Sequence, residues 1–187
     1  SLSLNNATFS YNQASGGDGG AVCVYLNSTA TLNNSTFANN TAYQGGGSVY
    51  ADTATVTIRN SYFHDNLATN GNGGSVNFHN NCTTTISGST FNNNTSTYLD
   101  GGAVYAQGTI DISSCYFTEN VSFRSGGAVY YDQSQSSSNN SSLTMTNSML
   151  RYNGTHGGTS GGNGGGMYAA AVRVTIRACT FSENYLN

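Results

Sequence analysis

A five-residue phrase that ends in Asn recurs seven times along the chain. Its copies read TFSYN at residues 8–12 and then TFANN, YFHDN, TFNNN, YFTEN, MLRYN and TFSEN. Neighbouring copies start 26 to 33 residues apart, and the length varies only between the phrases. A repeat of this length is typical of a solenoid, because one copy cannot bury its apolar face alone and stacks on its neighbours.

Three positions in and before this phrase keep their residue type. The aromatic position holds Phe9, Phe37, Phe63, Phe91, Phe117, Leu150 and Phe181. Three residues later come Asn12, Asn40, Asn66, Asn94, Asn120, Asn153 and Asn184. Five residues before the aromatic position lie Leu4, Leu32, Ile58, Ile86, Ile112, Met145 and Ile176. Equal positions of a solenoid lie one above another, so we predict an internal aromatic ladder and a hydrogen-bonded Asn ladder in a left-handed turn.

A second phrase follows in six copies, from GGAVC at residues 19–23 to GGGMY at residues 164–168. We expect its glycines to adopt, at another corner of the coil, a backbone conformation that would be strained in other residues. Short segments such as TVTIRN and VRVTIR alternate apolar and polar residues, which is strand periodicity. We therefore predict an all-β fold, a right-handed parallel β-helix (β-solenoid) of about seven coils of 26–33 residues. An antiparallel sandwich is the rival, but it would need no fixed period.

The repeat runs from one end of the sequence to the other, so we expect residues 1–187 to form a single solenoid segment. Solenoids need polar caps, because an open end exposes the core and unpaired strand edges. We recognise no cap in the sequence. The expectation is therefore a segment of a longer chain, or a unit that stacks end to end on itself or on neighbouring solenoid segments in a fibre.

The alternation of F-x-x-N with G-G-A-[ILV] resembles the repeat of the chlamydial polymorphic outer-membrane proteins. The two motifs cover nearly the whole chain, and six of the seven copies keep Phe at the aromatic position. The resemblance implies a secreted or cell-surface β-helix with an adhesive or structural role.

The low charge of the chain limits its partners. Charged residues make up 7% of the sequence, the formal net charge is −3, and Lys is absent. Nucleic-acid binding needs clustered Lys and Arg, so we expect no such partner. No apolar run approaches the ~20 residues of a membrane-spanning helix, so we expect no membrane span.

Acceptor sites for N-linked glycans are frequent in the sequence. The first candidates lie in expected loops: Asn27, Asn81, Asn139 and Asn140. Further candidates are Asn6, Asn33, Asn34, Asn39 and Asn93. Asn120 and Asn153 also stand in acceptor sequences, but as ladder positions their amides should be sequestered. Occupied sites would imply a eukaryotic secretory pathway and an extracellular or cell-surface glycoprotein.

The four cysteines are ambiguous: four Cys in a secreted chain could form intramolecular disulfides, but their positions favour free thiols. Cys115 and Cys179 share a position two residues before the aromatic one, but a coil with Ser148 lies between them. Two coils correspond to ~9.6 Å, which exceeds the Cα separation that a disulfide bridges. We expect small buried thiols at Cys23, Cys82, Cys115 and Cys179. No C-x-x-C spacing is present, and we expect neither a metal site nor a cofactor.

Enzymatic activity is not expected either. Polysaccharide hydrolysis in a β-helix would need stacked carboxylates on adjacent coils, ~5 Å apart for a retaining pair or further apart for an inverting one. Asp65, Glu119 and Glu183 share one position of the repeat, but Asn93 and Tyr152 occupy that position in the coils between them. We therefore assign no catalytic residue.

A column of tyrosines is the one candidate contact surface. The residue that closes the Gly phrase should point outward if the preceding Val points inward. This position holds Tyr50, Tyr105, Tyr130 and Tyr168 in four of the six copies. Such a column could stack on surface glycans, or it could merely stabilise the sheet as a cross-strand ladder.

The sequence favours a mechanical function: a structural rod of an extracellular, N-glycosylated filament, appendage or surface coat. The alternative is a cell-surface adhesin that binds glycans through the tyrosines and loops. A polysaccharide-active enzyme is the third possibility.

Overall fold

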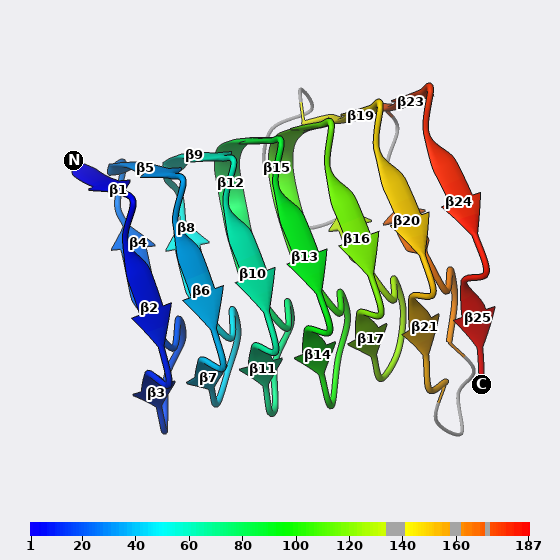
Figure 1. Cartoon of the computed structure of the whole chain (residues 1–187), viewed down its shortest axis with the longest axis horizontal. Helices are drawn as coiled ribbons and strands as arrows, with labels where there is room; N and C mark the ends of the chain where they lie inside the picture. The colour runs from blue at the N-terminus through cyan, green and yellow to red at the C-terminus, as the bar shows by residue number, and fades with distance from the viewer. Residues whose placement is uncertain (134–140, 158–161, 171–172) are drawn as a thin grey trace.

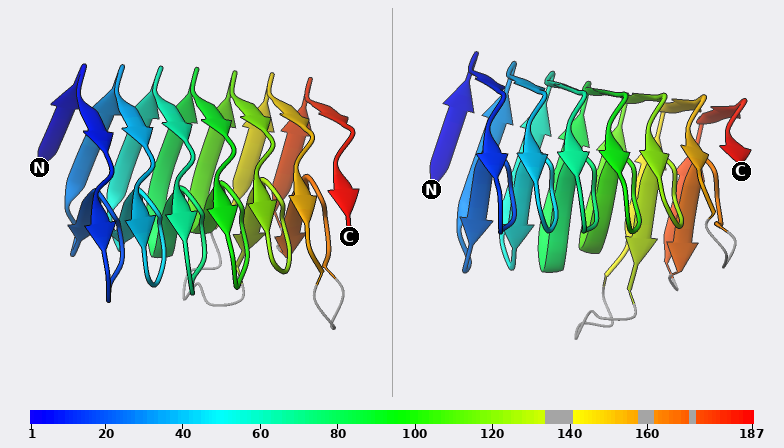
Figure 2. Two further views of the ribbon diagram at one scale, coloured as in Figure 1. Left: turned by 60° about the horizontal axis from the view of Figure 1, so that its bottom comes forward. Right: turned by 90° about the horizontal axis from the view of Figure 1, so that it is seen from below.

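The computed structural model describes residues 1–133, 141–157, 162–170 and 173–187, which wind into a solenoid of stacked coils (Figure 1). Every strand pairing in this part of the chain is parallel, and the strands form one 11-stranded and two 7-stranded sheets, here called sheets A, B and C. The two termini lie at opposite ends of the stack (Figure 2). The described residues contain no helix that could cross a membrane.

Sheet B carries the aromatic phrase. Its strands are β2 (Thr8–Ser10), β6 (Thr36–Ala38), β10 (Tyr62–His64), β13 (Thr90–Asn92), β16 (Tyr116–Thr118), β20 (Met149–Arg151) and β24 (Thr180–Ser182). Sheet C follows directly after each ladder Asn. Its strands are β3 (Gln13–Ala14), β7 (Thr41–Ala42), β11 (Leu67–Ala68), β14 (Thr95–Ser96), β17 (Val121–Ser122), β21 (Gly154–Thr155) and β25 (Tyr185–Leu186).

Sheet A closes each coil and has two parts. The strands after the Gly phrase are β4 (Val22–Tyr25), β8 (Val49–Asp52), β18 (Val129–Asp132) and β22 (Met167–Ala170). The strands before the aromatic phrase are β1 (Leu2–Asn5), β5 (Thr29–Asn33), β9 (Thr55–Arg59), β19 (Leu143–Thr146) and β23 (Val174–Arg177). In two coils the parts merge into the long strands β12 (Val76–Ser87) and β15 (Val104–Ser113).

The register aligns equal positions of the repeat. Phe63 pairs with Phe37 on one side and with Phe91 on the other. The ring centroids of Phe37 and Phe63 lie 4.7 Å apart with planes only 2° from parallel. These spacings match the distance between neighbouring strands of a sheet. The predicted all-β parallel solenoid with about one coil per phrase is thus confirmed.

The core is a continuous apolar column along the solenoid axis. It contains the aliphatic and aromatic positions of the repeat, and Phe37, Phe63, Phe91 and Phe117 are fully buried. One inward position of sheet A alternates in size, because Phe78 lies between Ala51 and Ala106 in the register. The small neighbours leave the volume that the large ring fills.

One predicted detail of the turn is wrong. The ladder Asn does not adopt the left-handed backbone; the residue before it does, and its φ is +56° at Asp65 and +57° at Glu119. This corner residue is exposed or half-buried in every coil, and its turn aims the next side chain, that of the Asn, into the interior. A second left-handed corner lies three residues before the aromatic position: Asn6, Asn34, Asn60, Gly88, Ser114, Asn147 and Ala178.

The two glycines of the Gly phrase serve different purposes. The first of each pair, for example Gly73 with a φ of +68°, is left-handed as expected. The second, for example Gly74, would place a Cβ 2.1 Å from the carbonyl oxygen of Gly102 in the next coil. Glycine is therefore needed there because the backbones of adjacent coils approach too closely for a side chain.

Candidate functional site

The interior members of the Asn ladder, from Asn40 to Asn153, use all of their hydrogen-bonding capacity within the fold. The Asn66 Nδ2 donates to Asn94 Oδ1 at 2.9 Å and to the carbonyl oxygen of Phe37 at 2.9 Å. Its Oδ1 accepts from both the backbone N and the Nδ2 of Asn40, each at 3.0 Å. The same pattern continues through Asn94, Asn120 and Asn153 to Asn184. An amide has two donors and two acceptor positions, so these side chains have nothing left for a ligand.

A second polar ladder was not predicted from the sequence. It occupies the position two residues before the aromatic one, which holds Ser in four coils and Ala or Cys in the others. The Ser61 Oγ accepts the backbone N–H of Ser35 at 3.2 Å and donates to the carbonyl oxygen of Arg59 at 2.8 Å. The frequency of Ser at this position was the available signal, because a size requirement alone would admit Ala equally well.

All four cysteines lie in the described part of the chain and are free. Cys82 and Cys115 are buried, and burial raises the pKa of each thiol to about 11. Cys179 is only partly buried because it lies in the last coil of the stack. The expected burial is wrong for Cys23, which lies in the outward-facing tyrosine column and is exposed.

Asp65 and Glu183, two of the acidic residues that directly precede a ladder Asn, bind separate partners. The Asp65 carboxylate contacts the Nδ1 of His64 at 2.7 Å and accepts from Asn93 Nδ2 at 2.6 Å. The hydrogen bond from His64 lowers the pKa of Asp65. Glu183 instead pairs with the Nε of Arg151 at 2.5 Å. In the described residues no group of three His, Cys, Asp or Glu side chains is arranged to hold a metal ion.

The glycosylation candidates differ in accessibility. Asn139 and Asn140 lie outside the described residues. Asn33 and Asn39 are half-buried. The exposed candidates are Asn6, Asn27, Asn34, Asn81 and Asn93. Asn27 and Asn81 line one shallow hollow together with Thr53.

The predicted contact surface of tyrosines is mostly covered. Tyr50 and Tyr105 are each only 7% exposed, whereas Tyr130 and Tyr168 are half-buried. The rings of Tyr105 and Tyr130 stack 5.2 Å apart, and those of Tyr130 and Tyr168 stack 5.0 Å apart. The Tyr105 hydroxyl also accepts a hydrogen bond from Gln107 Nε2 at 2.8 Å. Because the ring faces contact one another, the geometry is that of a stabilising ladder, with only parts of two rings left for a partner.

The tyrosine column runs beside the corners that precede the Gly phrase. The residues that directly precede the first glycine of each Gly phrase form a second column, here called the corner column. They are Asp18, Gly45, Asn72, Asp100, Ser125 and Asn163. Several of these side chains bind the backbone of the neighbouring coil: Asp18 Oδ1 accepts from Gly45 N at 2.9 Å, and Asp100 Oδ1 accepts from Ser125 N at 2.9 Å. Burial raises the pKa of both carboxyl groups.

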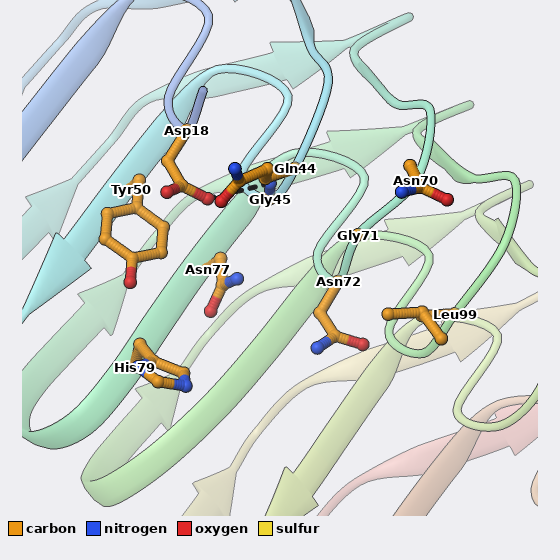
Figure 3. Close-up of a pocket in the computed structure, with 10 residues that line it drawn as sticks. All are labelled: Asp18, Gln44, Gly45, Tyr50, Asn70, Gly71, Asn72, Asn77, His79 and Leu99. Carbon is orange, nitrogen blue, oxygen red and sulfur yellow. Dashed lines mark hydrogen bonds between the residues drawn. The ribbon is translucent and has the colours of Figure 1, made fainter. Parts of the chain in front are cut away.

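Both columns are interrupted at the same place. Asn77 stands between Tyr50 and Tyr105 in the tyrosine column, and Gly45 stands between Asp18 and Asn72 in the corner column. Two small residues thus leave an open hollow of about 300 Å³. Figure 3 shows Asp18, Tyr50, Asn77 and His79 along one side and Asn72 on the other.

Sequence reasoning missed this hollow, although a signal was present. The two departures from the repeat, at Gly45 and Asn77, lie more than one full repeat apart in the sequence. Only the stacking of coils brings them together.

A family model described as right handed beta helix region matches residues 2–158. No curated protein and no solved structure gives a significant match.

Proposed function

Because the chain belongs to the right-handed β-helix family, we propose that it acts as a structural rod on a cell surface or in an extracellular filament, appendage or coat. The observation that carries this proposal is the continuity of the ladders. The stacked rings from Phe9 to Phe117 and the Asn hydrogen bonds from Asn12 to Asn184 hold the coils in one register. Such repetition favours a stiff element over a single reactive centre.

End-to-end association belongs to the same proposal. The last coil leaves Ile176 and Phe181 44% and 43% exposed at positions that are fully buried in the middle coils. One more coil in register would cover these side chains and pair the strand edges of β23 and β24. A second copy of the chain or a neighbouring solenoid segment could supply such a coil.

Electron microscopy and fibre diffraction of the native material test the rod. We expect elongated particles and a repeat of ~4.8 Å along their axis, which is the strand spacing. Isolated globular particles without axial order would contradict the proposal.

The proposal also includes N-linked glycosylation and an extracellular location. The exposed acceptor asparagines support it, while Asn94, Asn120 and Asn153 are fully buried and can carry no glycan without unfolding. Intact-mass measurement of the native protein before and after glycosidase treatment tests it. A mass unchanged by the enzyme would remove glycosylation from the proposal.

We propose no enzymatic activity. The carboxylates of Asp65, Glu119 and Glu183 lie two coils apart, or about 9.6 Å at the usual strand spacing, with Asn93 and Tyr152 between them. A retaining pair needs about 5–5.5 Å and an inverting pair about 6.5–9.5 Å. Asp65 and Glu183 are in addition bound by other side chains, Asp65 by His64 and Glu183 by Arg151. Turnover of a polysaccharide by the purified chain would contradict the proposed lack of enzymatic activity.

The adhesive role that the resemblance to the chlamydial proteins implies remains a second candidate. The half-buried Tyr130 and Tyr168 favour it, since parts of both rings can still be reached from solvent. We expect glycan binding through this column to be lost in Tyr130→Ala and kept in Tyr105→Ala, whose ring is almost inaccessible. Equal binding by both variants would point to a different surface.

A further inference from the structure

Asn followed directly by Gly is the dipeptide in which an Asn side chain loses its amide nitrogen most readily. Because Gly carries no side chain, its backbone nitrogen can turn toward the Cγ of the Asn before it. The sequence contains four such pairs: Asn70–Gly71, Asn72–Gly73, Asn153–Gly154 and Asn163–Gly164. The last pair belongs to the last Gly phrase. The other three have a coil on both sides, and the fold holds them in different ways.

The pair Asn153–Gly154 is restrained at both of its reacting groups. The Asn153 Nδ2 donates to Asn184 Oδ1 and to the carbonyl oxygen of Phe117, each at 2.9 Å. Its Oδ1 accepts from the backbone N of Asn120 at 3.0 Å. The N–H of Gly154, the nucleophile in a ring closure, donates to the carbonyl oxygen of Asn120 at 2.9 Å. Ring closure would have to break these buried bonds together.

The pair Asn72–Gly73 is restrained by a single residue of the next coil. The Asn72 Oδ1 accepts from the backbone N of Asp100 at 3.1 Å. The N–H of Gly73 donates to the carbonyl oxygen of the same Asp100 at 2.9 Å. These two bonds fix the Asn amide and the following nitrogen, and the second one opposes the loss of the proton that the reaction requires.

The pair Asn70–Gly71 has neither restraint. The Asn70 side chain is exposed and forms no hydrogen bond within the described residues. Two residues before the Gly phrase, the N–H groups of Gln44 and Arg124 donate to a carbonyl oxygen of the coil before, each at 3.0 Å. The N–H of Gly71 stands at the same position and makes no hydrogen bond to any described residue. Nucleophile and amide are thus both free at this one interior pair.

We propose that Asn70 is a site of spontaneous deamidation in the folded protein. The Gly71 nitrogen gives its proton to solvent base and forms a bond to the Cγ of Asn70. The bond from Cγ to Nδ2 breaks, and Nδ2 takes up a proton from water and leaves as ammonia. Water then opens the succinimide ring at either carbonyl, which leaves aspartate or isoaspartate at position 70. The reaction needs only water and base, and it does not depend on the rod function.

The close approach of two coils keeps this reactive pair in the sequence. A Cβ on Gly71 would overlap the carbonyl oxygen of Gln44, so a larger residue that slows ring closure cannot stand there unless the coils move apart. Asn70 and Asp18 both line the open hollow (Figure 3). Deamidation therefore adds a second carboxylate to that lining.

Peptide mapping by mass spectrometry tests the assignment. The full chain is kept folded in mildly alkaline buffer, and conversion at each Asn–Gly pair is followed with time. An isoaspartate-specific carboxyl methyltransferase counts the isoaspartate independently. We expect Asn70 to convert at least 10-fold faster than Asn72 and Asn153. Conversion of Asn70 at the rate of either of these residues, or more slowly, would overturn the proposal.

Two controls separate the effect of the fold from that of the local sequence. In concentrated urea the three pairs should convert at similar rates, because their hydrogen bonds are lost. Asn70→Gln lengthens the side chain and disfavours the five-membered ring, so the folded variant should lose the methyltransferase signal. Its thermal midpoint should be unchanged, since the Asn70 side chain has no hydrogen bond to lose. A preference for Asn70 that persists in urea would show that the fold does not select this site.

Discussion

A single amide side chain connects three successive coils in this protein. Asn94 bonds to Asn66 before it, to Asn120 after it and to the carbonyl oxygen of Phe63. The residue directly before each ladder Asn has a left-handed backbone conformation, which only Gly adopts without strain. Individual residues therefore set the corners, and they reinforce the register that the strand pairing gives.

Removal of one interior ladder amide should be costly. We expect Asn94→Ala to lower the free energy of unfolding by about 3 kcal/mol or more, because several buried groups lose their partners together. Urea denaturation followed by circular dichroism measures the change. Asn12→Ala at the exposed first coil is the control and should cost less than about 1 kcal/mol. Equal losses in the two variants would mean that burial of the ladder does not matter.

Two adjacent coils offer a reciprocal test of the left-handed corner. Gly88 and Ser114 occupy the same position with φ values of +57° and +54°. Gly88→Ser should destabilise the protein by about 1 kcal/mol, and Ser114→Gly should stabilise it by a similar or smaller amount. Thermal unfolding of both variants gives the signs. The same sign in both would show that packing, not backbone conformation, governs this corner.

At the scale of the strand and its neighbours, buried tyrosines on both faces of sheet A make the stability of the fold depend on pH. Burial, and next the nearby carboxylates of Asp132 and Asp100, raise the pKa of Tyr105 to about 12. Burial, and to a lesser degree Asp132, raise the pKa of Tyr131 to about 12, and its hydroxyl donates to the carbonyl oxygen of Gly108 at 2.7 Å. The folded state therefore keeps phenolic protons that the unfolded state releases near pH 10.

Stability should consequently be full below about pH 9 and fall as the pH rises toward 12. The unfolded chain loses thiol protons from Cys82 and Cys115 near pH 9 and phenolic protons near pH 10, while the folded chain retains both kinds. Thermal midpoints between pH 8 and 11.5, with phenolate absorbance at 295 nm, check this. Tyr105→Phe should give a shallower decline, and a midpoint that rises above pH 10 would refute the assignment.

The strands and the aromatic and Asn ladders could be predicted from the sequence because each coil repeats the same offsets. Phe37 and Phe63 meet because they hold equal positions, and no other information was needed. The burial of Tyr50 and Tyr105 could not be foreseen, because alternation shows only that a side chain points outward and not that a neighbouring corner covers it. The hollow was missed for a similar reason: Gly45 and Asn77 meet across two columns, whereas the offsets compare residues within one.

At the scale of the whole molecule, the coils form one stack whose contacts are almost entirely between neighbours. Sheets B and C each pass through every coil, and the ladders follow the same axis (Figure 2). In such an arrangement stability is close to a sum over coils and their interfaces. Loss of one interface, as in the Asn94 variant, is expected to weaken the stack locally before the rest unfolds.

The direction of the hydrogen bonds has a mechanical consequence. The covalent chain circles the axis, while the bonds from Asn40 to Asn66 and from Asn66 to Asn94 run along it. Because the covalent chain is wound around the axis, hydrogen bonds between coils carry axial tension until a coil has come loose, whereas compression presses the rings together. Pulled in a force microscope, the molecule should lengthen in steps of roughly 90 Å, the length of one coil when extended. The solenoid is therefore better suited to resist compression than to carry tension as a tether.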